Sequence, residues 1–206
     1  MAATLHTDRL VLDTPNEGDV GAVLELCQDP QIQRWLPIAS PFTQSDAQFF
    51  IDSYVPHGEA SGAYTTWALR LAEEAPLIGS VEVRLDEAPA SASLGCWMGA
   101  PYRGLGLMTE ALSAIRAYAF APDGLTLTEL HWHSLAGNRA SAALAGALGF
   151  IRDAEGPRTF DFRGRRRAVW AATLRPRAAE LSEPEPGPLP PGEPRPDAPP
   201  RAATGS

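Results

Sequence analysis

Residues 102–112, YRGLGLMTEAL, place two glycines directly ahead of an apolar run with helical spacing. Glycine weakens a helix and offers no side chain for packing, so glycines here indicate that the backbone itself is used. A helix N-terminus exposes unpaired N–H groups and carries the positive end of the helix dipole. Glycines just before it allow an anion to approach closely, so the stretch predicts a diphosphate site.

Two common phosphate-binding folds do not fit this stretch. A dinucleotide-binding turn would have a third glycine where Thr109 stands, and a P-loop needs a Gly-Lys-Ser/Thr sequence. The chain contains no lysine at all. On the residues alone, a tight turn from strand to helix with no ligand remains an alternative, and so does a nicotinamide-dinucleotide domain.

The composition restricts the partners and divides the chain. A net charge of −8 argues against nucleic acid as a partner and suits an amine-bearing one. Residues 176–206 hold ten of the twenty prolines and no aromatic residue, so we expect a disordered tail after a single domain at 1–175. The sequence lacks a signal-like start and a long apolar stretch, and its two cysteines are far apart. We therefore expect a cytoplasmic protein with reduced thiols and no membrane partner.

The pattern of apolar residues predicts an α/β (α+β) domain with a mixed sheet and helices on both faces. A helix capped by Asp19 is expected to end at Pro30, followed by a proline-broken loop and a second helix from about Ser45. After the glycines come a helix, a strand, a helix capped by Asn138 and stopped by Gly149, and a hairpin. Strands are expected at 7–15, 63–72, 76–87, 92–99 and 128–135, and the hairpin at 158–174.

The glycine stretch resembles the acyl-CoA-binding motif of the GNAT superfamily of N-acetyltransferases. The matching positions are Arg103, Gly104, Leu105, Gly106, Leu107 and Met108. Met108 departs from the small residue usual there. The segments HTDRLVL, LIGSVEV, LGCWM and AGNRASAALAGALGF look like the RimJ/RimL-like branch of ribosomal-protein alanine acetyltransferases. The resemblance covers roughly residues 5–175, and the predicted element order agrees with that fold.

The resemblance implies a mostly antiparallel sheet in which two parallel strands, 92–99 and 128–135, splay apart around acetyl-CoA. Pantetheine would pair with the backbone at Trp97, Met98 and Gly99, and the diphosphate would bind the amides of residues 104–108. Asn138 and Ser141 match the N-x-x-S of the family, at the start of the helix that faces the thioester. No metal is implied.

Acetyl transfer to an amine requires a base, an oxyanion donor and help for the departing thiolate. A free N–H near Trp97–Gly99 could bind the oxyanion. Ser141 could donate a hydrogen bond to the thiolate, or it could only bond to backbone in the first helical turn. The carboxylate that many relatives carry before the cleft is absent, because Ser93 stands in its place.

Two residues remain as candidate bases. Glu82 lies on an interior strand, and its alternative role is a structural ion pair with Arg84. His133 ends the strand at the cleft and has a suitable intrinsic pKa. His131 lies on the same face as His133, but no third ligand with suitable spacing supports a metal site.

Acceptor contacts in this fold would come from the loop after the first helix and from the final hairpin. Trp35 and Phe42 could line an acceptor pocket or only attach their loop to the sheet. The basic run RGRRR at 163–167 could be a solvated turn, or it could contact the 3′-phosphate of CoA or an acidic acceptor.

The predicted function is transfer of an acetyl group from acetyl-CoA to a primary amine, either a protein N-terminus or a small amine. The transfer would proceed by direct attack in a ternary complex, and a homodimer is implied by resemblance only. The alternative is an acyl-CoA-binding regulatory domain without turnover.

Overall fold

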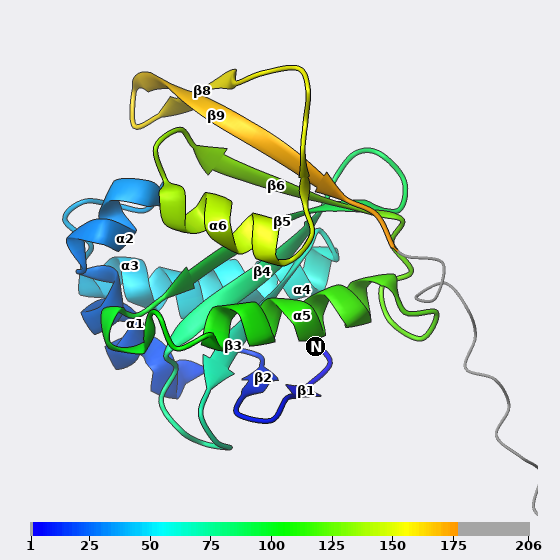
Figure 1. The fold of residues 1–206 in the computed structure, drawn as a ribbon. Coiled ribbons are helices and arrows are strands. Elements are labelled where there is room, and N and C mark those ends of the chain that lie inside the picture. The colour runs from blue at the N-terminus through cyan, green and yellow to red at the C-terminus, as the bar shows by residue number, and fades with distance from the viewer. Residues whose placement is uncertain (1, 177–206) are drawn as a thin grey trace, which may run out of the picture.

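The computed structural model describes residues 2–176 (Figure 1). The predicted tail lies outside the described residues, apart from Pro176. The helical segments are η1 (Glu17–Asp19), α1 (Val20–Cys27), α2 (Pro30–Trp35), α3 (Gln44–Phe49), η2 (Phe50–Tyr54), α4 (Val55–Ser61), η3 (Ala100–Tyr102), α5 (Leu107–Phe120) and α6 (Arg139–Ala147). The strands are β1 (Leu5–His6), β2 (Val11–Asp13), β3 (Tyr64–Arg70), β4 (Gly79–Leu85), β5 (Ser91–Met98), β6 (Glu129–Leu135), β7 (Ile151–Arg152), β8 (Arg158–Phe162) and β9 (Arg165–Leu174).

The strands form one sheet in the order β1-β2-β3-β4-β5-β6-β9-β7, with β8 paired to β9. Every pairing is antiparallel except β5 with β6, which run parallel. β5 and β6 can run parallel because α5 connects them and carries the chain back to the end of the sheet at which β5 begins. The predicted mixed, mostly antiparallel sheet is confirmed.

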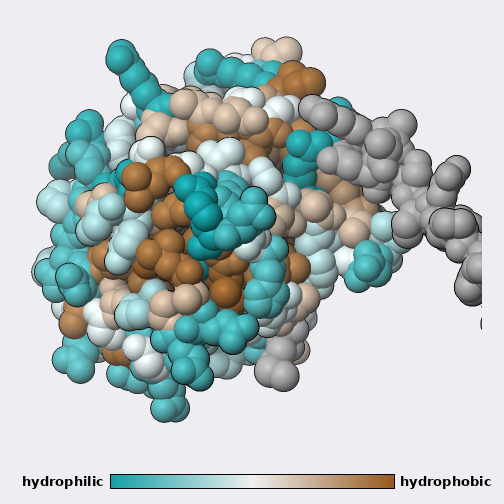
Figure 2. Space-filling model, turned by 60° about the horizontal axis from the view of Figure 1, so that its bottom comes forward, coloured by the Kyte–Doolittle hydropathy of each residue, from teal (hydrophilic) through white to brown (hydrophobic). Residues whose placement is uncertain are grey.

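Helices cover both faces of the sheet, as predicted. On one face Val81 and Val83 of β4 pack with Leu112 and Ile115 of α5 in a core to which α6 also contributes. On the other face α1 and α3 pack over Ala68 of β3. Neighbouring strand residues enter opposite cores because successive side chains in a strand point to opposite faces. Figure 2 shows apolar side chains gathered near the middle of one face, surrounded by hydrophilic ones.

Two local expectations were wrong. The predicted strand at 7–15 contains only β2, because residues 7–10 form a turn in which the N–H of Thr7 donates to the carbonyl of Leu10; β1 lies before this turn. The predicted loop after Pro30 begins with α2, because Asp29 caps this helix and Pro30 occupies its first turn, where a missing N–H costs nothing. The second helix, expected from about Ser45, starts at Gln44, where Thr43 provides its cap, so this expectation is confirmed.

Asp19 does not cap α1, because its carboxylate has other partners. It accepts the N–H of Asn16 and forms a buried ion pair with Arg70 of β3, at 2.7 Å. Asn138 and Gly149, in contrast, fulfil their predicted roles at the two ends of α6. The carboxamide of Asn138 caps the helix, and Gly149 has φ +89° while Phe150 donates back to the carbonyl of Ala145.

Candidate active site

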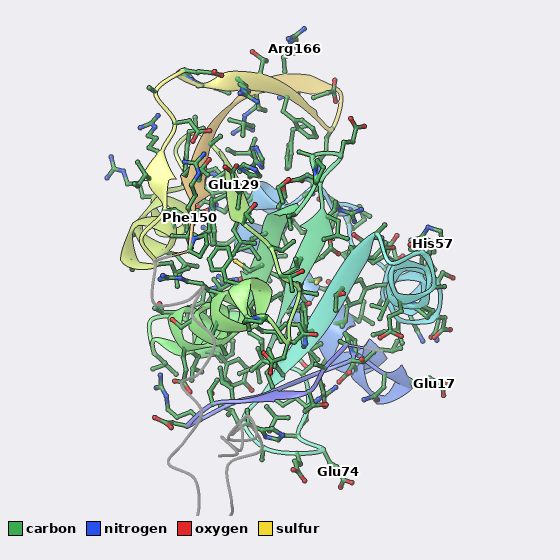
Figure 3. The ribbon with its side chains drawn as sticks, turned by 90° about the vertical axis from the view of Figure 1, so that its right-hand side faces the viewer. Glu17, His57, Glu74, Glu129, Phe150 and Arg166 are labelled. Atoms are coloured by element: carbon green, nitrogen blue, oxygen red, sulfur yellow. The ribbon has the colours of Figure 1, made fainter. Side chains whose placement is uncertain are left out.

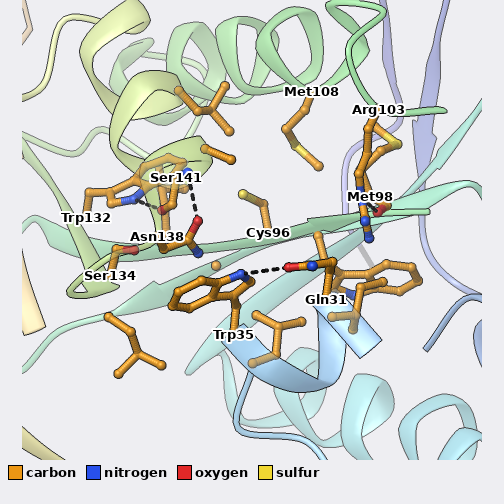
Figure 4. Close-up of a pocket in the computed structure, with 18 of the residues that line it drawn as sticks. Gln31, Trp35, Cys96, Met98, Arg103, Met108, Trp132, Ser134, Asn138 and Ser141 are labelled. Carbon is orange, nitrogen blue, oxygen red and sulfur yellow. Dashed lines mark hydrogen bonds between the residues drawn. The ribbon is translucent and has the colours of Figure 1, made fainter. Parts of the chain in front are cut away.

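The parallel strands β5 and β6 separate part-way along their length. They pair from Ser91 opposite Glu129 to Leu94 opposite Trp132, and pairing stops there although both strands continue. The unpaired halves line a cavity of about 1020 Å³. The N-terminal ends of α5 and α6 border it, as does α2 (Figure 4). Residues of the β8–β9 hairpin also line it. The divergence of the two strands creates this cavity in the middle of the sheet.

The glycine turn forms one end of the cavity. Gly104 and Gly106 have φ values of +75° and +77°, in the left-handed region that favours glycine. The first intrahelical bond of α5 runs from the N–H of Glu110 to the carbonyl of Gly106. The N–H groups of residues 107–109 therefore lack an intrahelical partner, and these residues line the cavity. The turn thus presents backbone donors at a helix N-terminus, which fits a diphosphate.

Arg9 supports the glycine turn, a role that the sequence did not reveal. Its Nη1 donates to the carbonyl of Leu105 at 2.9 Å, and its guanidinium pairs with Glu110 at 2.6 Å. Thr7 donates to the same carboxylate, and this bond is the main reason why the pKa of Glu110 is lowered. The side chain of Leu105 is 56% exposed and lies off the cavity wall. Contacts across 101 residues of sequence separation therefore hold the turn.

Arg103 reaches the cavity wall, but its charge is already paired. Its Nε donates to the carbonyl of Met98 at 2.8 Å, and its Nη2 lies 2.5 Å from the carboxylate of Asp29. The same carboxylate caps α2 through the N–H of Gln31. Arg103 therefore links the glycine turn to β5 and to the start of α2, rather than adding an unpaired positive charge.

The end of β5 has backbone N–H groups directed toward the gap between β5 and β6 at two residues, Cys96 and Met98, but not at Gly99. Gly99 donates its N–H to the carbonyl of Ile78, so it is not the free donor that was expected. Its side-chain position is also closed, since a Cβ would lie 2.7 Å from Leu26. In an antiparallel ladder the bonding direction alternates, which turns the N–H groups of Cys96 and Met98 away from β4 and toward the gap. Trp97 and Met98 line the cavity, whereas Gly99 does not.

Ser141 lies on the opposite wall, in the first turn of α6. Its N–H donates to the carboxamide oxygen of Asn138, and its Oγ accepts a hydrogen bond from Nε1 of Trp132 at 2.9 Å (Figure 4). Because the indole occupies one lone pair of Oγ, the hydroxyl hydrogen is left to point elsewhere. Ser141, Asn138 and Trp132 all line the cavity.

Glu82 is not part of the cavity wall. Its carboxylate accepts hydrogen bonds from Tyr54 at 2.8 Å and from Arg84 at 3.0 Å. Thr66 adds a weaker contact at 3.4 Å, and Arg84 stacks on Tyr64. The carboxylate therefore serves a structural network between β3, β4 and η2, which was the alternative interpretation of this residue.

His133 lies on the cavity wall near the end of β6. Partial desolvation, followed by the charge of His131, lowers its pKa below the ordinary value of 6.5, so the imidazole is neutral at physiological pH. Within residues 2–176, no cluster of three His, Cys, Asp or Glu residues could hold a metal ion.

Cys96 also lines the cavity, but its thiol is a poor nucleophile. Desolvation raises its pKa to about 12, so the sulfur stays protonated at neutral pH. An acetyl group could not readily be passed through this residue.

The end of the cavity opposite the glycines has aromatic and aliphatic walls. Trp35 of α2 lines it, and Nε1 of Trp35 donates to the side chain of Gln31. Phe42 does not line it, because this residue is buried in the core beneath α1 and α3. Sequence analysis missed Phe160 and Phe162, which come from the hairpin.

The tip of the hairpin leans over the chain that follows α2. Arg163 donates to the carbonyls of Leu36 and Ile38, at 3.3 and 2.7 Å. In contrast, Arg166 points away from the body of the molecule (Figure 3). The basic run at 163–167 is therefore not simply a solvated turn, because Arg163 connects the hairpin to the segment that follows α2. Arg166, which points outward, does remain available to solvent.

Comparison with known proteins identifies the architecture. Residues 9–151 match the model of the acetyltransferase (GNAT) domain. The chain belongs to the GNAT acetyltransferase family. It is therefore an acyltransferase, and the glycine turn and the unpaired amides of α5 fit the diphosphate of an acyl-CoA donor. None of the helices in residues 2–176 combines the length and apolarity needed to span a bilayer.

Solved structures of similar fold belong to enzymes with different acceptors. A Vibrio cholerae protein assigned as a ribosomal-protein-serine acetyltransferase is 25% identical, with a TM-score of 0.73 over 84% of this chain and 98% of its own. RimL, the ribosomal L7/L12 alpha-N-protein acetyltransferase solved with CoA, is 16% identical, with a TM-score of 0.73 over 84% and 98%. Spermidine N-acetyltransferase from Vibrio cholerae, solved with CoA and spermine, is 18% identical, with a TM-score of 0.67 over 82% and 96%.

Proposed function

We propose that this GNAT enzyme transfers the acetyl group to a primary amine by direct attack within a ternary complex. One observation carries the proposal: a single cavity is lined by the glycine turn, by the aromatic residues of α2 and the hairpin, and by Ser141 and His133. A donor and an acceptor can therefore meet without a covalent enzyme intermediate. The protonated thiol of Cys96 supports the same conclusion.

The reaction forms a carbon–nitrogen bond and breaks the thioester carbon–sulfur bond. His133 accepts the proton that the attacking nitrogen loses, because its imidazole is neutral and lies on the wall. The backbone N–H of Met98 faces the gap and is our candidate donor to the developing oxyanion. The hydroxyl of Ser141 donates a hydrogen bond to the departing sulfur. Its oxygen already accepts the hydrogen bond from Trp132, so its hydrogen is available for this contact. The negative charge leaves on the thiolate, which a solvent proton neutralises.

Binding of the donor is tested first by calorimetry with acetyl-CoA on the wild type and on Gly106→Glu, with NADH as a control ligand. The variant places a carboxylate where the diphosphate would bind, so we expect binding to fall below detection. Circular dichroism of the variant checks that it is folded. Binding that survives the substitution, or NADH binding that CoA fails to displace, would overturn the assignment of the turn.

Turnover is then followed by thiol release with a panel of amines. We expect Ser141→Ala and His133→Ala to slow acetylation, and Glu82→Gln to leave kcat unchanged because Glu82 lies outside the cavity. An acyl-CoA-binding regulatory domain, the alternative, predicts tight binding of acetyl-CoA with no thiol release above the hydrolysis blank for any amine.

A further inference from the structure

The acceptor end of the cavity has a marked chemical bias. Trp35, Leu36 and Pro37 form one wall, and Phe160, Phe162 and Val169 of the hairpin form the other, with Leu135 of β6 adjoining them. Phe162 is 7% exposed, so its ring is fixed by packing, whereas Phe160 is 57% exposed and lies at the solvent side of this wall. Aromatic and aliphatic walls of this kind bind ligands through the burial of apolar surface.

The cavity has no acidic side chain on its walls. Among residues 2–176, neither aspartate nor glutamate lines it, and Arg103 is the only lining side chain with a permanent charge. The Oε1 atom of the neutral Gln31 side chain already accepts the indole N–H of Trp35, and the charged group in contact with this ring is a cation, the guanidinium of Arg34, 4.8 Å from the ring centroid. A positively charged group inside would therefore find no counter-ion on the walls.

The carboxylates on neighbouring elements are engaged elsewhere. Asp29 pairs with Arg103, and Glu82 is held by Tyr54 and Arg84. Asp86 accepts a hydrogen bond from Ser93 at 2.8 Å. Turning any of them into the cavity would break these contacts and leave a cation or a hydroxyl group without its partner, which is costly for groups that are partly buried.

We infer that the acceptor is a monoamine attached to an apolar body, and that the site rejects acceptors whose second positive charge would lie between the apolar walls of the cavity. The inference rests on the proposed amine acetylation and adds its substrate class. The reacting amine can enter neutral, since His133 or solvent takes its proton. A second ammonium has no group nearby to accept its proton. It would therefore be desolvated as a cation between apolar walls with no counter-ion.

The first experiment compares hexylamine with 1,6-diaminohexane, which differ only in the second amino group. Two tetrapeptides that differ only at the first residue, Phe or Lys, provide a second pair with a free α-amine. We expect kcat/KM at pH 7.5 to be at least about tenfold higher for hexylamine and for the Phe peptide, which corresponds to about 1.4 kcal/mol. Equal rates, or faster acetylation of the diamine or the Lys peptide, would overturn the inference and leave the proposed function intact.

The second experiment places a carboxylate on the apolar wall. Val169→Glu should raise kcat/KM for 1,6-diaminohexane relative to hexylamine by about tenfold, by supplying the missing counter-ion. Val169→Gln, of matched size and without charge, should leave the ratio unchanged. A similar shift in both variants would show that shape rather than charge governs the choice. Tight acetyl-CoA binding with no acetylation of any of the four probes would refute the proposed function itself, and this inference with it.

Discussion

The indole Nε1 of Trp132 donates a 2.9 Å hydrogen bond to the Oγ of Ser141. Trp132 lies on β6 and Ser141 on α6, and the indole is held by edge-on packing against Phe150 at 5.4 Å between ring centroids. A serine hydroxyl rotates freely unless a partner fixes it. The hydrogen bond from Trp132 thus fixes the orientation of the Ser141 hydroxyl, which could otherwise rotate to donate either to the backbone or into the cavity.

Trp132→Phe should therefore slow acetyl transfer without unfolding the protein. The ring packing against Phe150 is kept, and only the N–H is lost. We expect kcat to fall by about tenfold, the value of one ordinary hydrogen bond, while the Kd for acetyl-CoA changes little. Steady-state kinetics and calorimetry measure the two quantities.

A double-mutant cycle separates positioning from general damage. In a Ser141→Ala background the further change Trp132→Phe should have no effect on kcat, because the hydroxyl to be oriented is gone. Additive losses in the two backgrounds would mean that the tryptophan acts independently of the serine.

The acid limb of the pH–rate profile should report His133. Its pKa lies below 6.5 mainly because of partial desolvation, with His131 and Arg158 opposing its protonation and Asp86 and Asp153 favouring it. The neutral, proton-accepting form therefore dominates above that pKa and is lost as the pH falls through it. We expect kcat, measured at saturating acceptor so that ionisation of the free amine does not contribute, to decline only below pH 6.5, and His133→Ala to abolish that limb. A limb with a midpoint above 6.5 would exclude His133 as its origin.

Arg163→Ala should weaken acceptor binding and spare the donor. The substitution removes the bonds from the hairpin to the carbonyls of Leu36 and Ile38, so the two apolar walls lose a connection. We expect the KM of the acceptor to rise several-fold, about 1 kcal/mol, with the Kd for acetyl-CoA unchanged. Arg166→Ala is the matched control, because this side chain points outward from the same hairpin (Figure 3). Equal effects of the two variants would indicate a general charge effect.

The buried ion pair of Arg70 and Asp19 should be the most sensitive polar contact of the domain. Arg70 is 3% exposed and Asp19 2%, and Arg70 also bonds to Asp13 and to the carbonyl of Ala75. Asp19→Ala leaves the buried guanidinium of Arg70 without its main counter-ion. We therefore expect a loss of about 3 kcal/mol in the free energy of unfolding, measured with urea. Asp13→Ala should cost less, since its side chain is 29% exposed.

The glycine turn could be predicted because its cause is local. Gly104 and Gly106 adopt positive φ, which few other residues tolerate, and the helix that follows has a clear apolar stripe. The caps of α6 at Asn138 and Gly149 were predicted for the same reason, since both act within a few residues of their own position. Pro30 shows the limit of such reasoning, because a proline both ends one helix and begins another.

The partners of charged residues depended on contacts between distant segments. Arg9 supports the turn across 96 residues, and Glu82 turns to Tyr54 rather than to the cavity. Phe42 is buried in the second core, whereas Phe160 of the hairpin lines the acceptor end. These contacts could not be predicted from the sequence, because each depends on how β3, β4 and the hairpin pack against the helices.

By itself, the sequence determined the order of the main strands and helices from residue 63 onward, the backbone donors at the start of α5 and the resemblance to the acetyltransferase family. These properties follow from short-range patterns, namely φ preferences, helical caps and the alternation of apolar residues. Only the tertiary structure decided which side chains face the cavity, that Arg103 is neutralised by Asp29, and that the acceptor end has apolar walls without a carboxylate. The position of a side chain on a wall is set by the divergence of β5 from β6 and by packing between segments far apart in the chain.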